Sequence, residues 1–358
     1  MATLMRKSGY PWAKHTAPDC TRWWPGLVLM AMVVLLLAPF VQAGEPAPPV
    51  VTTAQGVVQG SSDGAIAKFL GIPYAAPPVG ARRWQPPEEA APWTAIRPSQ
   101  AFGPACMQPH QMEGAQYNED CLSLNIWTPS LEKKAHLPVM VWIHGGAFTY
   151  GSGPQAEYDG KHLAGHGVVV VTLNYRLGPL GFLAHPLLDQ ESAHHTSGNY
   201  GLLDQIAALR WVQRNIAFFG GDPGNVTLFG QSAGSRSVGL LLLTPLSAGL
   251  FHRAIAQSGG PLIGSEFLSP VFNGNQRMIA AMGQKLAQKL GCDTSEDELA
   301  ALRAQPAAAI VAAAATQTDI LEDSGLFFAP ALDGYVLPDN ALAALEQGHL
   351  HDVPLILG

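Results

Sequence analysis

The sequence predicts an α/β fold with a mostly parallel central sheet flanked by helices, and two observations carry this prediction. Three short apolar segments, residues 139–143, 168–173 and 226–229, are rich in β-branched or aromatic residues and are bounded by Gly or Pro. Such segments are typical of buried strands in a parallel sheet. Between the second and third, apolar residues of 202–218 recur every three or four positions, which predicts an amphipathic helix. Strand, helix and strand in this order form the repeating unit of an α/β fold.

The composition fits one large globular domain. The chain has 358 residues, of which 47% are hydrophobic and 13% are charged. A chain of this kind can bury a sizeable core and is unlike a disordered polypeptide. Its 38 glycines and 29 prolines predict many turns and long loops.

The first 43 residues predict a signal peptide. Four basic residues are followed by the apolar run Leu27–Ala38, and Val41-Gln42-Ala43 has the small residues of a cleavage site. The alternative is a membrane anchor, but a spanning helix needs about 20 apolar residues. We therefore expect export to the periplasm or the medium, cleavage after Ala43, no stable membrane anchor, and a mature domain over 44–358.

The charge of the mature chain bears on its partners. Cleavage would remove four basic residues and one acidic residue, leaving 16 Lys and Arg against 26 Asp and Glu, a net charge of −10. This disfavours nucleic acids and anionic membranes as partners.

The other elements follow from shorter patterns. Residues 50–58 predict an edge strand, 72–117 predict long surface loops, and 254–256 predict a further strand. Residues 275–315 are rich in Ala and predict two helices, with Ser295 as an N-cap and Glu298 completing a capping box.

Two of the four cysteines lie in one loop-like stretch. Cys106 and Cys121 are separated by 14 residues, and export would allow a disulfide between them. Closing a loop of that size stabilises a fold by about 3 kcal/mol. Cys20 belongs to the leader, and Cys292 has no obvious partner.

The strongest chemical motif is Gly230-Gln231-Ser232-Ala233-Gly234. It follows a predicted strand and precedes the helix-compatible run 238–243. In this context G-x-S-x-G is typical of a nucleophile elbow, a tight turn that lifts the serine hydroxyl above the sheet. The alternative is an ordinary turn rich in Gly and Ser.

A second motif, His144-Gly145-Gly146-Ala147-Phe148, directly follows the 139–143 segment. Such a loop can aim backbone N–H groups at the negative oxygen of an acyl-transfer intermediate. The alternative is again a plain glycine-rich turn. His144 precedes the serine, whereas an elbow enzyme of this kind has its histidine after it, so we interpret His144 as a positioning residue.

With these motifs, the sequence resembles the type-B carboxylesterases, a family that includes cholinesterases and bacterial para-nitrobenzyl esterases. The resemblance runs from about residue 50 to 358. Beyond the two motifs, the matching segments are 71–75, 77–80, 83–84, 119–127, 174–176, 198–205, 221–223 and 225–227.

The resemblance implies an α/β-hydrolase fold and a site. Ser232 would be the nucleophile, the amides of Gly146, Ala147 and Ala233 would form the oxyanion hole, and Gly145 and Ser258 would support it. The resemblance also supports a Cys106–Cys121 disulfide. The substrate would be a small-molecule carboxylic ester, and no metal or organic cofactor is implied.

The sequence departs from the family pattern at three places. Gln231 stands where the family usually has Glu, which removes a charge beside the serine. Ala301 stands where a partner for Cys292 would be. The family's catalytic acid and histidine are expected beyond Gly358, so the hydrolase domain is expected to lack its C-terminal part.

These departures leave two functional hypotheses. The first is a carboxylic ester hydrolase that acts through a serine acyl-enzyme. Under this hypothesis the given chain lacks the catalytic acid and the catalytic base and is expected to be inactive by itself. Asp333 or Asp339 with His349 or His351 satisfies the order of the chain, but these residues match family positions with no catalytic role. The second hypothesis is an esterase-like binding or adhesion domain without catalysis.

Overall fold

The computed structural model describes residues 47–358, except 110–113, 260–275, 315–327 and 340. The predicted signal peptide and its cleavage site lie outside the described residues. Within these ranges, no helix is long and apolar enough to cross a membrane.

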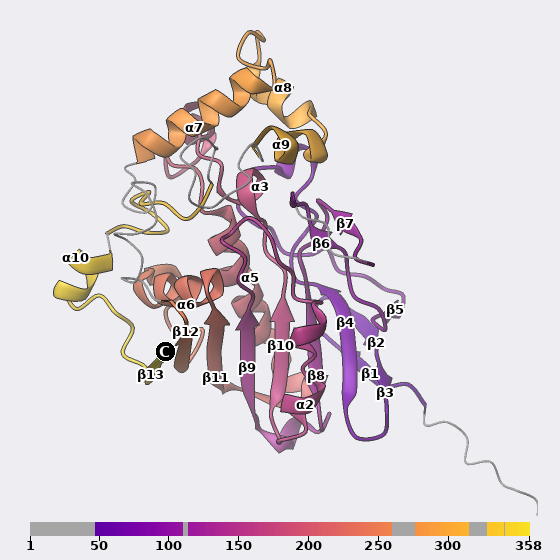
Figure 1. Cartoon of the computed structure of the whole chain (residues 1–358). Helices are drawn as coiled ribbons and strands as arrows, with labels where there is room; N and C mark the ends of the chain where they lie inside the picture. Colours follow the sequence, from indigo (N-terminus) through magenta and orange to yellow (C-terminus); the bar gives the residue numbers. More distant parts are fainter. Residues whose placement is uncertain (1–46, 110–113, 260–275, 315–327, 340) are drawn as a thin grey trace, which may run out of the picture. The chain divides into compact units, whose positions relative to one another are not determined.

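The core of the fold is an eight-stranded mixed sheet (Figure 1). The five strands from β13 to β10 are parallel, and β8, β4 and β3 continue the sheet in antiparallel pairings. The α/β prediction is therefore confirmed. In spatial order the strands are β13 (Leu355–Leu357), β12 (Arg253–Gln257), β11 (Gly221–Gln231), β9 (Leu137–Ile143), β10 (Val169–Leu173), β8 (Ser123–Thr128), β4 (Ala67–Pro73) and β3 (Ser61–Ser62).

The three strands predicted from apolar segments are the centre of this sheet. β9 lies between β10 and β11, with Val141 opposite Val171 on one side and Leu228 on the other. All three side chains are fully buried. β10 is buried at every residue, which fits burial on both faces, whereas β11 alternates between the buried Val226 and Leu228 and the half-buried Thr227 and Phe229.

Helices cover the sheet, and the longest is the one that the sequence predicted. α5 (Tyr200–Asn215) continues into the short 3-10 helix η4 (Ile216–Phe219), with Ile206, Leu209 and Val212 buried and Arg210 and Arg214 exposed. The other α-helices described are α2 (Lys161–Ala164), α3 (Gly178–Phe182), α4 (Pro186–Glu191), α6 (Ala233–Leu243), α7 (Gln276–Lys289), α8 (Glu298–Ala304), α9 (Ala307–Ala314) and α10 (Ala341–Glu346).

The predicted edge strand over 50–58 is two strands. β1 (Val50–Thr52) and β2 (Val57–Gln59) pair as an antiparallel hairpin, and β5 (Arg97–Pro98) joins β2 in a separate small sheet. The chain turns between them, where Thr53 donates its N–H to the carbonyl of Gly56 at 2.9 Å. The predicted loop region 72–117 contains β5, β6 (Ala105–Cys106) and the 3-10 helix η1 (Gly80–Arg82). β6 pairs with β7 (Tyr117–Asn118).

The prediction of two helices over 275–315 was wrong, because α7, α8 and α9 are three separate helices. The capping box was also wrong. Asp297 is the N-cap of α8, and its carboxylate accepts the N–H of Ala300 at 2.9 Å. Ser295 instead donates its hydroxyl to the carbonyl of Asp297. A carboxylate directly before the first helical residue can reach the free N–H groups, whereas Ser295 lies two residues too early.

The expected disulfide is present. Cys106 and Cys121 are bonded, with their Cα atoms 5.0 Å apart. Cys292 is buried and free, as expected, and Gln305 donates an N–H to its sulfur.

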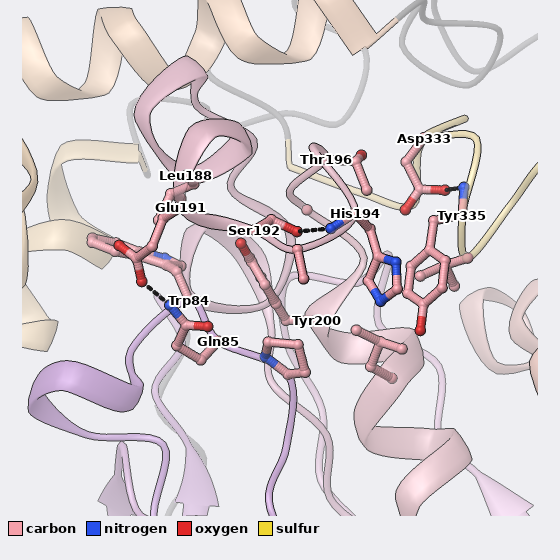
Figure 2. A pocket seen from close by; sticks show the side chains of 15 residues that line it. Trp84, Gln85, Leu188, Glu191, Ser192, His194, Thr196, Tyr200, Asp333 and Tyr335 are labelled. Carbon is pink, nitrogen blue, oxygen red and sulfur yellow. Dashed lines mark hydrogen bonds between the residues drawn. The ribbon is translucent and has the colours of Figure 1, made fainter.

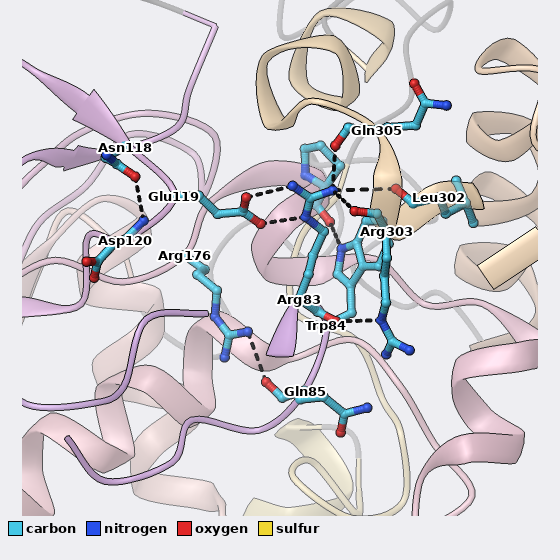
Figure 3. Close-up of polar contacts among 11 residues, drawn as sticks. Arg83, Trp84, Gln85, Asn118, Glu119, Asp120, Arg176, Leu302, Arg303 and Gln305 are labelled. Carbon is cyan, nitrogen blue, oxygen red and sulfur yellow. Dashed lines mark hydrogen bonds and ion pairs between the residues drawn. The ribbon is translucent and has the colours of Figure 1, made fainter. Parts of the chain in front are cut away.

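A buried arginine joins distant parts of the chain (Figure 3). Nε and Nη2 of Arg83 donate to the two carboxylate oxygens of Glu119, at 2.5 and 2.6 Å. The same guanidinium donates to the carbonyls of Arg303 and Gln305, at the C-terminal end of α8. One side chain thus fastens the loop after β4, the disulfide loop and a late helix to each other.

Candidate active site

The sheet topology creates one natural place for a site. From β9 the chain crosses to β10 on one side, and from β10 it returns through α5 to β11 on the other side of β9. The connections therefore diverge between β9 and β11, and ligands in open α/β sheets bind beyond the carboxyl ends of strands at such a switch point. The two motifs follow these two strand ends: His144 comes directly after β9, and Ser232 directly after β11.

Ser232 stands in a strained turn between strand and helix. Its φ of 56° and ψ of −119° lie outside the regions that side chains favour, and its side chain is exposed. In this turn β11, α6 and the neighbouring strand β9 approach one another very closely. A Cβ on Gly234 would lie 2.1 Å from the carbonyl oxygen of Ile143, and one on Gly230 would lie 2.6 Å from the carbonyl carbon of Gly234. Only glycine fits at both positions.

The loop after β9 lies against this serine. A Cβ on Gly145 would come within 3.2 Å of the Cβ of Ser232 and 2.8 Å of the carbonyl oxygen of Gln231. The next three residues, Gly146, Ala147 and Phe148, all have positive φ, at 107°, 52° and 61°. A run of this kind holds successive N–H groups in one concave arrangement, which suits an anionic oxygen.

Donors for such an oxygen are available. Within the described residues, the backbone N–H groups of Gly146, Ala147 and Ala233 make no hydrogen bond. Gly146 instead accepts through its carbonyl from the N–H groups of Thr149 and Tyr150, and this fixes the loop. Ala233 is the first residue of α6, where N–H groups have no partner within the helix.

His144 is part of the support and does not face the serine as a base. It is fully buried, and its ring stacks on Tyr175 with centroids 4.4 Å apart. Its Nδ1 donates to the carbonyl of Gly145, and the hydroxyl of Tyr175 donates to the carbonyl of His144. Burial lowers the pKa of His144 from 6.5 to about 4, so the ring is neutral at neutral pH.

Ser258 follows the neighbouring strand end. Gln257 of β12 pairs with Gln231 of β11 and accepts the N–H of Ser232 at 3.0 Å. Ser258 itself has a φ of 54°, and a Cβ on the next residue, Gly259, would lie 3.1 Å from the carbonyl oxygen of Ser232. The structure therefore brings the Ser258 turn and the Ser232 turn together.

The substitute acids and bases considered from the sequence are engaged elsewhere. His351 contacts the carbonyl of Thr244 at 2.9 Å through Nε2, at the end of α6 opposite to Ser232. Twelve helical steps separate Ser232 and Thr244 along α6, about 18 Å at 1.5 Å per residue. Asp333 is buried in a turn and accepts the N–H groups of Tyr335 and Leu337.

The remaining candidates form a surface pair. Nδ1 of His349 lies 3.4 Å from a carboxylate oxygen of Asp339, and both side chains are substantially exposed. Within the part of the chain that the structure describes, the hydroxyl of Ser232 has no hydrogen-bond partner. No acid or base is therefore assigned to Ser232.

This combination of strained serine and glycine loop agrees with comparisons to known proteins. Residues 47–358 match the carboxylesterase family. The chain belongs to this family. It is 43% identical over 314 residues to the fumonisin B1 esterase of Sphingopyxis macrogoltabida, covering 86% of this chain and 54% of that protein. It is 42% identical to the para-nitrobenzyl esterase of Bacillus subtilis, covering 86% of this chain and 62% of that protein.

Solved structures of the same family have the same fold. A para-nitrobenzyl esterase superposes with a TM-score of 0.76 at 40% identity, covering 87% of this chain and 63% of that one. A carboxylesterase of Geobacillus stearothermophilus gives a TM-score of 0.74 at 42% identity, covering 86% and 60%. The family and the α/β-hydrolase fold are thereby confirmed. The chain spans between about half and two thirds of the length of these relatives.

Two cavities of this carboxylesterase-family chain lie elsewhere. One, of about 300 Å³, is lined by Trp84, His194, Tyr335 and neighbouring residues (Figure 2). The rings of His194 and Tyr335 stack there, with their centroids 3.5 Å apart. The other, of about 740 Å³, lies between the disulfide loop and residues 152–157. Neither is lined by Ser232 or by residues 144–148.

Sequence analysis missed one charged residue beside the serine. Arg236 is in the first turn of α6, and its N–H donates to the carbonyl of Ser232 at 3.0 Å. The arginine is only 8% exposed. The sequence feature that could have revealed Arg236 is its position, as a basic residue four places after Ser232 in a helix of otherwise small or apolar residues.

Proposed function

We propose that this protein hydrolyses small carboxylic esters through an acyl-enzyme at Ser232. The observation that carries the proposal is the strained Ser232 turn packed against the glycine loop at the switch point of the sheet. The names of the relatives, which are esterases, support the same reaction class. No metal or organic cofactor takes part in the proposed reaction.

The chemistry would proceed in two steps. Oγ of Ser232 attacks the carbonyl carbon of the ester, and the negative charge on the carbonyl oxygen is held by N–H groups of Gly146, Ala147 and Ala233. Collapse of this intermediate breaks the bond to the alcohol, which leaves with a proton. Water then attacks the acyl-serine in the same way, releasing the acid and restoring the hydroxyl. One such N–H donor contributes about 10² to 10³ in rate.

A second candidate, a non-catalytic binding domain, is favoured by one observation. The Ser232 hydroxyl has no hydrogen-bonded base within the described ranges. A serine hydroxyl without a base is a weak nucleophile. This candidate keeps the fold and the Ser232 turn and drops the turnover.

One experiment separates the two. The purified protein is treated with a fluorophosphonate probe and assayed with a 4-nitrophenyl ester, beside Ser232→Ala. An esterase is labelled at Ser232, and its turnover falls by about 10³-fold or more in Ser232→Ala. Absence of both labelling and turnover in the wild type would favour the binding domain.

We also propose that residues 1–43 direct export of this protein. The Cys106–Cys121 disulfide supports the proposal, since such bonds persist in oxidising compartments. Edman sequencing of protein recovered from the periplasm or medium should begin at Gly44. Recovery of the uncut chain from the cytoplasm alone would refute it.

A further inference from the structure

The cavity of about 300 Å³ combines aromatic walls with acidic groups (Figure 2). Four of its lining residues carry aromatic rings and two carry carboxylates, whereas no Lys or Arg is among the described residues that line it. The rings are those of Trp84, His194, Tyr200 and Tyr335, and the carboxylates are those of Glu191 and Asp333. Small-molecule sites combine apolar walls with a few polar groups in this way, and this volume is at the lower end of their range.

The carboxylate of Glu191 already has a counter-ion. Its two oxygens accept from the guanidinium of Arg303, at 2.8 and 2.9 Å. The side-chain amide of Gln85 donates to one of the same oxygens (Figure 2). The charge of this wall is therefore balanced by the chain itself, and a charged ligand gains little from it.

Asp333 is different, because both of its hydrogen bonds to the turn end on the same oxygen. Oδ1 accepts the N–H of Tyr335 at 3.1 Å and the N–H of Leu337 at 2.8 Å. Figure 2 shows the other oxygen, Oδ2, turned away from this turn and toward the side of the cavity where His194 lies. Within the described residues, no Lys, Arg or His forms an ion pair with Asp333.

The Asp333 carboxyl is also desolvated. The residue is only 9% exposed. Burial raises the pKa of the carboxyl above its usual value, although the N–H groups of the turn and the side chain of Asn199 act in the opposite direction. A buried carboxylate without a counter-ion is costly, because the protein interior solvates the charge less well than water does. A positively charged ligand at Oδ2 removes that cost.

The aromatic walls favour the same kind of ligand, because the face of an aromatic ring attracts a cation. The rings of His194 and Tyr335 stack with their centroids 3.5 Å apart. Tyr335 is joined to Asp333 through its backbone N–H, so this pair of rings belongs to the same corner of the cavity as the carboxylate. A neutral ligand such as a sugar also packs against rings, but it leaves the charge of Asp333 without a partner.

We propose that this cavity binds an organic primary ammonium ion, with the ammonium group on Asp333 and an apolar body against the aromatic rings. The proposal goes beyond the ester hydrolysis proposed above, because none of the residues that line the cavity takes part in that reaction. Binding is reversible and involves no covalent step. It therefore requires nothing of Ser232.

Calorimetric titration of two ligands with the same skeleton tests the charge. 2-Phenylethylamine is protonated at pH 8, whereas 2-phenylethanol carries a neutral hydroxyl at the same position. We expect the wild-type protein to bind the amine about tenfold or more tightly than the alcohol, the size expected for a charged hydrogen bond. Equal affinities for the two ligands, or no binding of the amine, would overturn the proposal.

Asp333→Asn tests the position. Asparagine keeps Oδ1 as the acceptor for Tyr335 and Leu337, so the turn is retained while the charge at Oδ2 is removed. The affinity for the amine should fall about tenfold or more, and the affinity for the alcohol should stay within about twofold of the wild type. An amine affinity in Asp333→Asn within twofold of the wild type would refute the site.

The matched control removes the carboxylate of the other cavity. Glu157 is the acidic residue among those that line the cavity of about 740 Å³. Glu157→Gln changes the net charge as Asp333→Asn does and should leave the amine affinity at its wild-type value. A loss in Glu157→Gln without a loss in Asp333→Asn would place the amine in the other cavity and contradict the proposal.

A second variant covers the case in which Asp333→Asn does not fold. Tyr335→Leu removes one ring of the stacked pair and keeps the backbone N–H that bonds to Asp333. The amine affinity should then fall about fivefold, the size of one cation–π contact. An unchanged amine affinity in Tyr335→Leu would count against the cavity as the binding site.

Discussion

At the scale of single residues, local geometry and burial distinguish the serine that is placed to react from the histidine that supports the glycine loop. Ser232 is exposed in a strained turn, whereas His144, only one residue from the glycine loop, is buried and stacked on Tyr175. The sequence order had already suggested a positioning role for His144. The structure adds the physical reason, which is that a fully desolvated imidazole is held neutral and faces a carbonyl.

The lowered pKa of His144 predicts a pH dependence of stability. Its pKa is about 4 in the folded chain and about 6.5 in an unfolded one, so the unfolded state binds more protons between these values. The stabilisation is fully present above about pH 6.5 and is lost as the pH falls toward 4. A shift of this size corresponds to about 3 kcal/mol.

Urea unfolding between pH 7 and pH 4.5 measures this effect. We expect the free energy of unfolding to fall less steeply with pH in His144→Gln than in the wild type, whatever its value at pH 7. The exposed His162→Gln serves as the control and should keep the wild-type slope. Equal slopes for His144→Gln and the wild type would contradict the explanation.

At the scale of elements, the site depends on how closely β9, β11 and α6 approach each other. The strands themselves were predictable, because each contains a short apolar run rich in β-branched or aromatic residues. The order of the strands in the sheet was not predictable from these patterns, because the pairing of β9 with both β10 and β11 joins residues that are distant in sequence. That order places the glycine loop beside Ser232.

The close approach predicts a large cost for Gly234→Ala. The added Cβ would lie 2.1 Å from the carbonyl oxygen of Ile143, which is backbone and cannot turn away. β9 and α6 would have to separate, and overpacking of this kind costs about 3 kcal/mol. Chemical denaturation, with soluble yield beside it, measures the loss.

The control for that change is Gly224→Ala. Its Cβ would meet only the carboxylate of Asp222, at 3.2 Å, and a side chain can move. We expect a small change in the free energy of unfolding. Comparable losses in the two variants would mean that the crossing of β9 and α6 is not the cause.

Helix boundaries show where sequence patterns fail at this scale. The pattern S-x-x-E at Ser295 and Glu298 matched a capping box, but Asp297 caps the helix. Both residues are good N-caps, and the choice depends on where packing starts the helix. Such competition among local hydrogen bonds cannot be resolved from sequence alone.

At the scale of the whole molecule, buried charges hold distant segments together. Arg83 pairs with Glu119 and satisfies carbonyls at the end of α8, some 220 residues later (Figure 3). Arg176 and Asp204 form a second pair that is almost fully buried. The sequence contained these residues within the matching segments, but their pairing is a property of the folded chain.

Removal of one partner from the Arg83 pair should be strongly destabilising. Arg83→Met leaves the Glu119 carboxylate buried without its cation, and breaking a buried pair in this way costs about 3 to 5 kcal/mol. The exposed pair of Arg82 and Glu88 is the matched control, and Arg82→Met should cost about 1 kcal/mol or less. Thermal and urea unfolding of the two variants compare these losses. A loss below that of Arg82→Met would contradict the role given to Arg83.

The sequence by itself determined the fold class, the central strands, the long helix, the disulfide and the two motifs, because each depends on local pattern or on a dense resemblance. Tertiary structure decided which of these residues meet. It set Gly145 against Ser232 and the Ser258 turn beside Ser232, tied His351 to the far end of α6, and buried Arg236 in the first turn of that helix. These outcomes depend on contacts between residues far apart in sequence, and such contacts exist only once the sheet has formed.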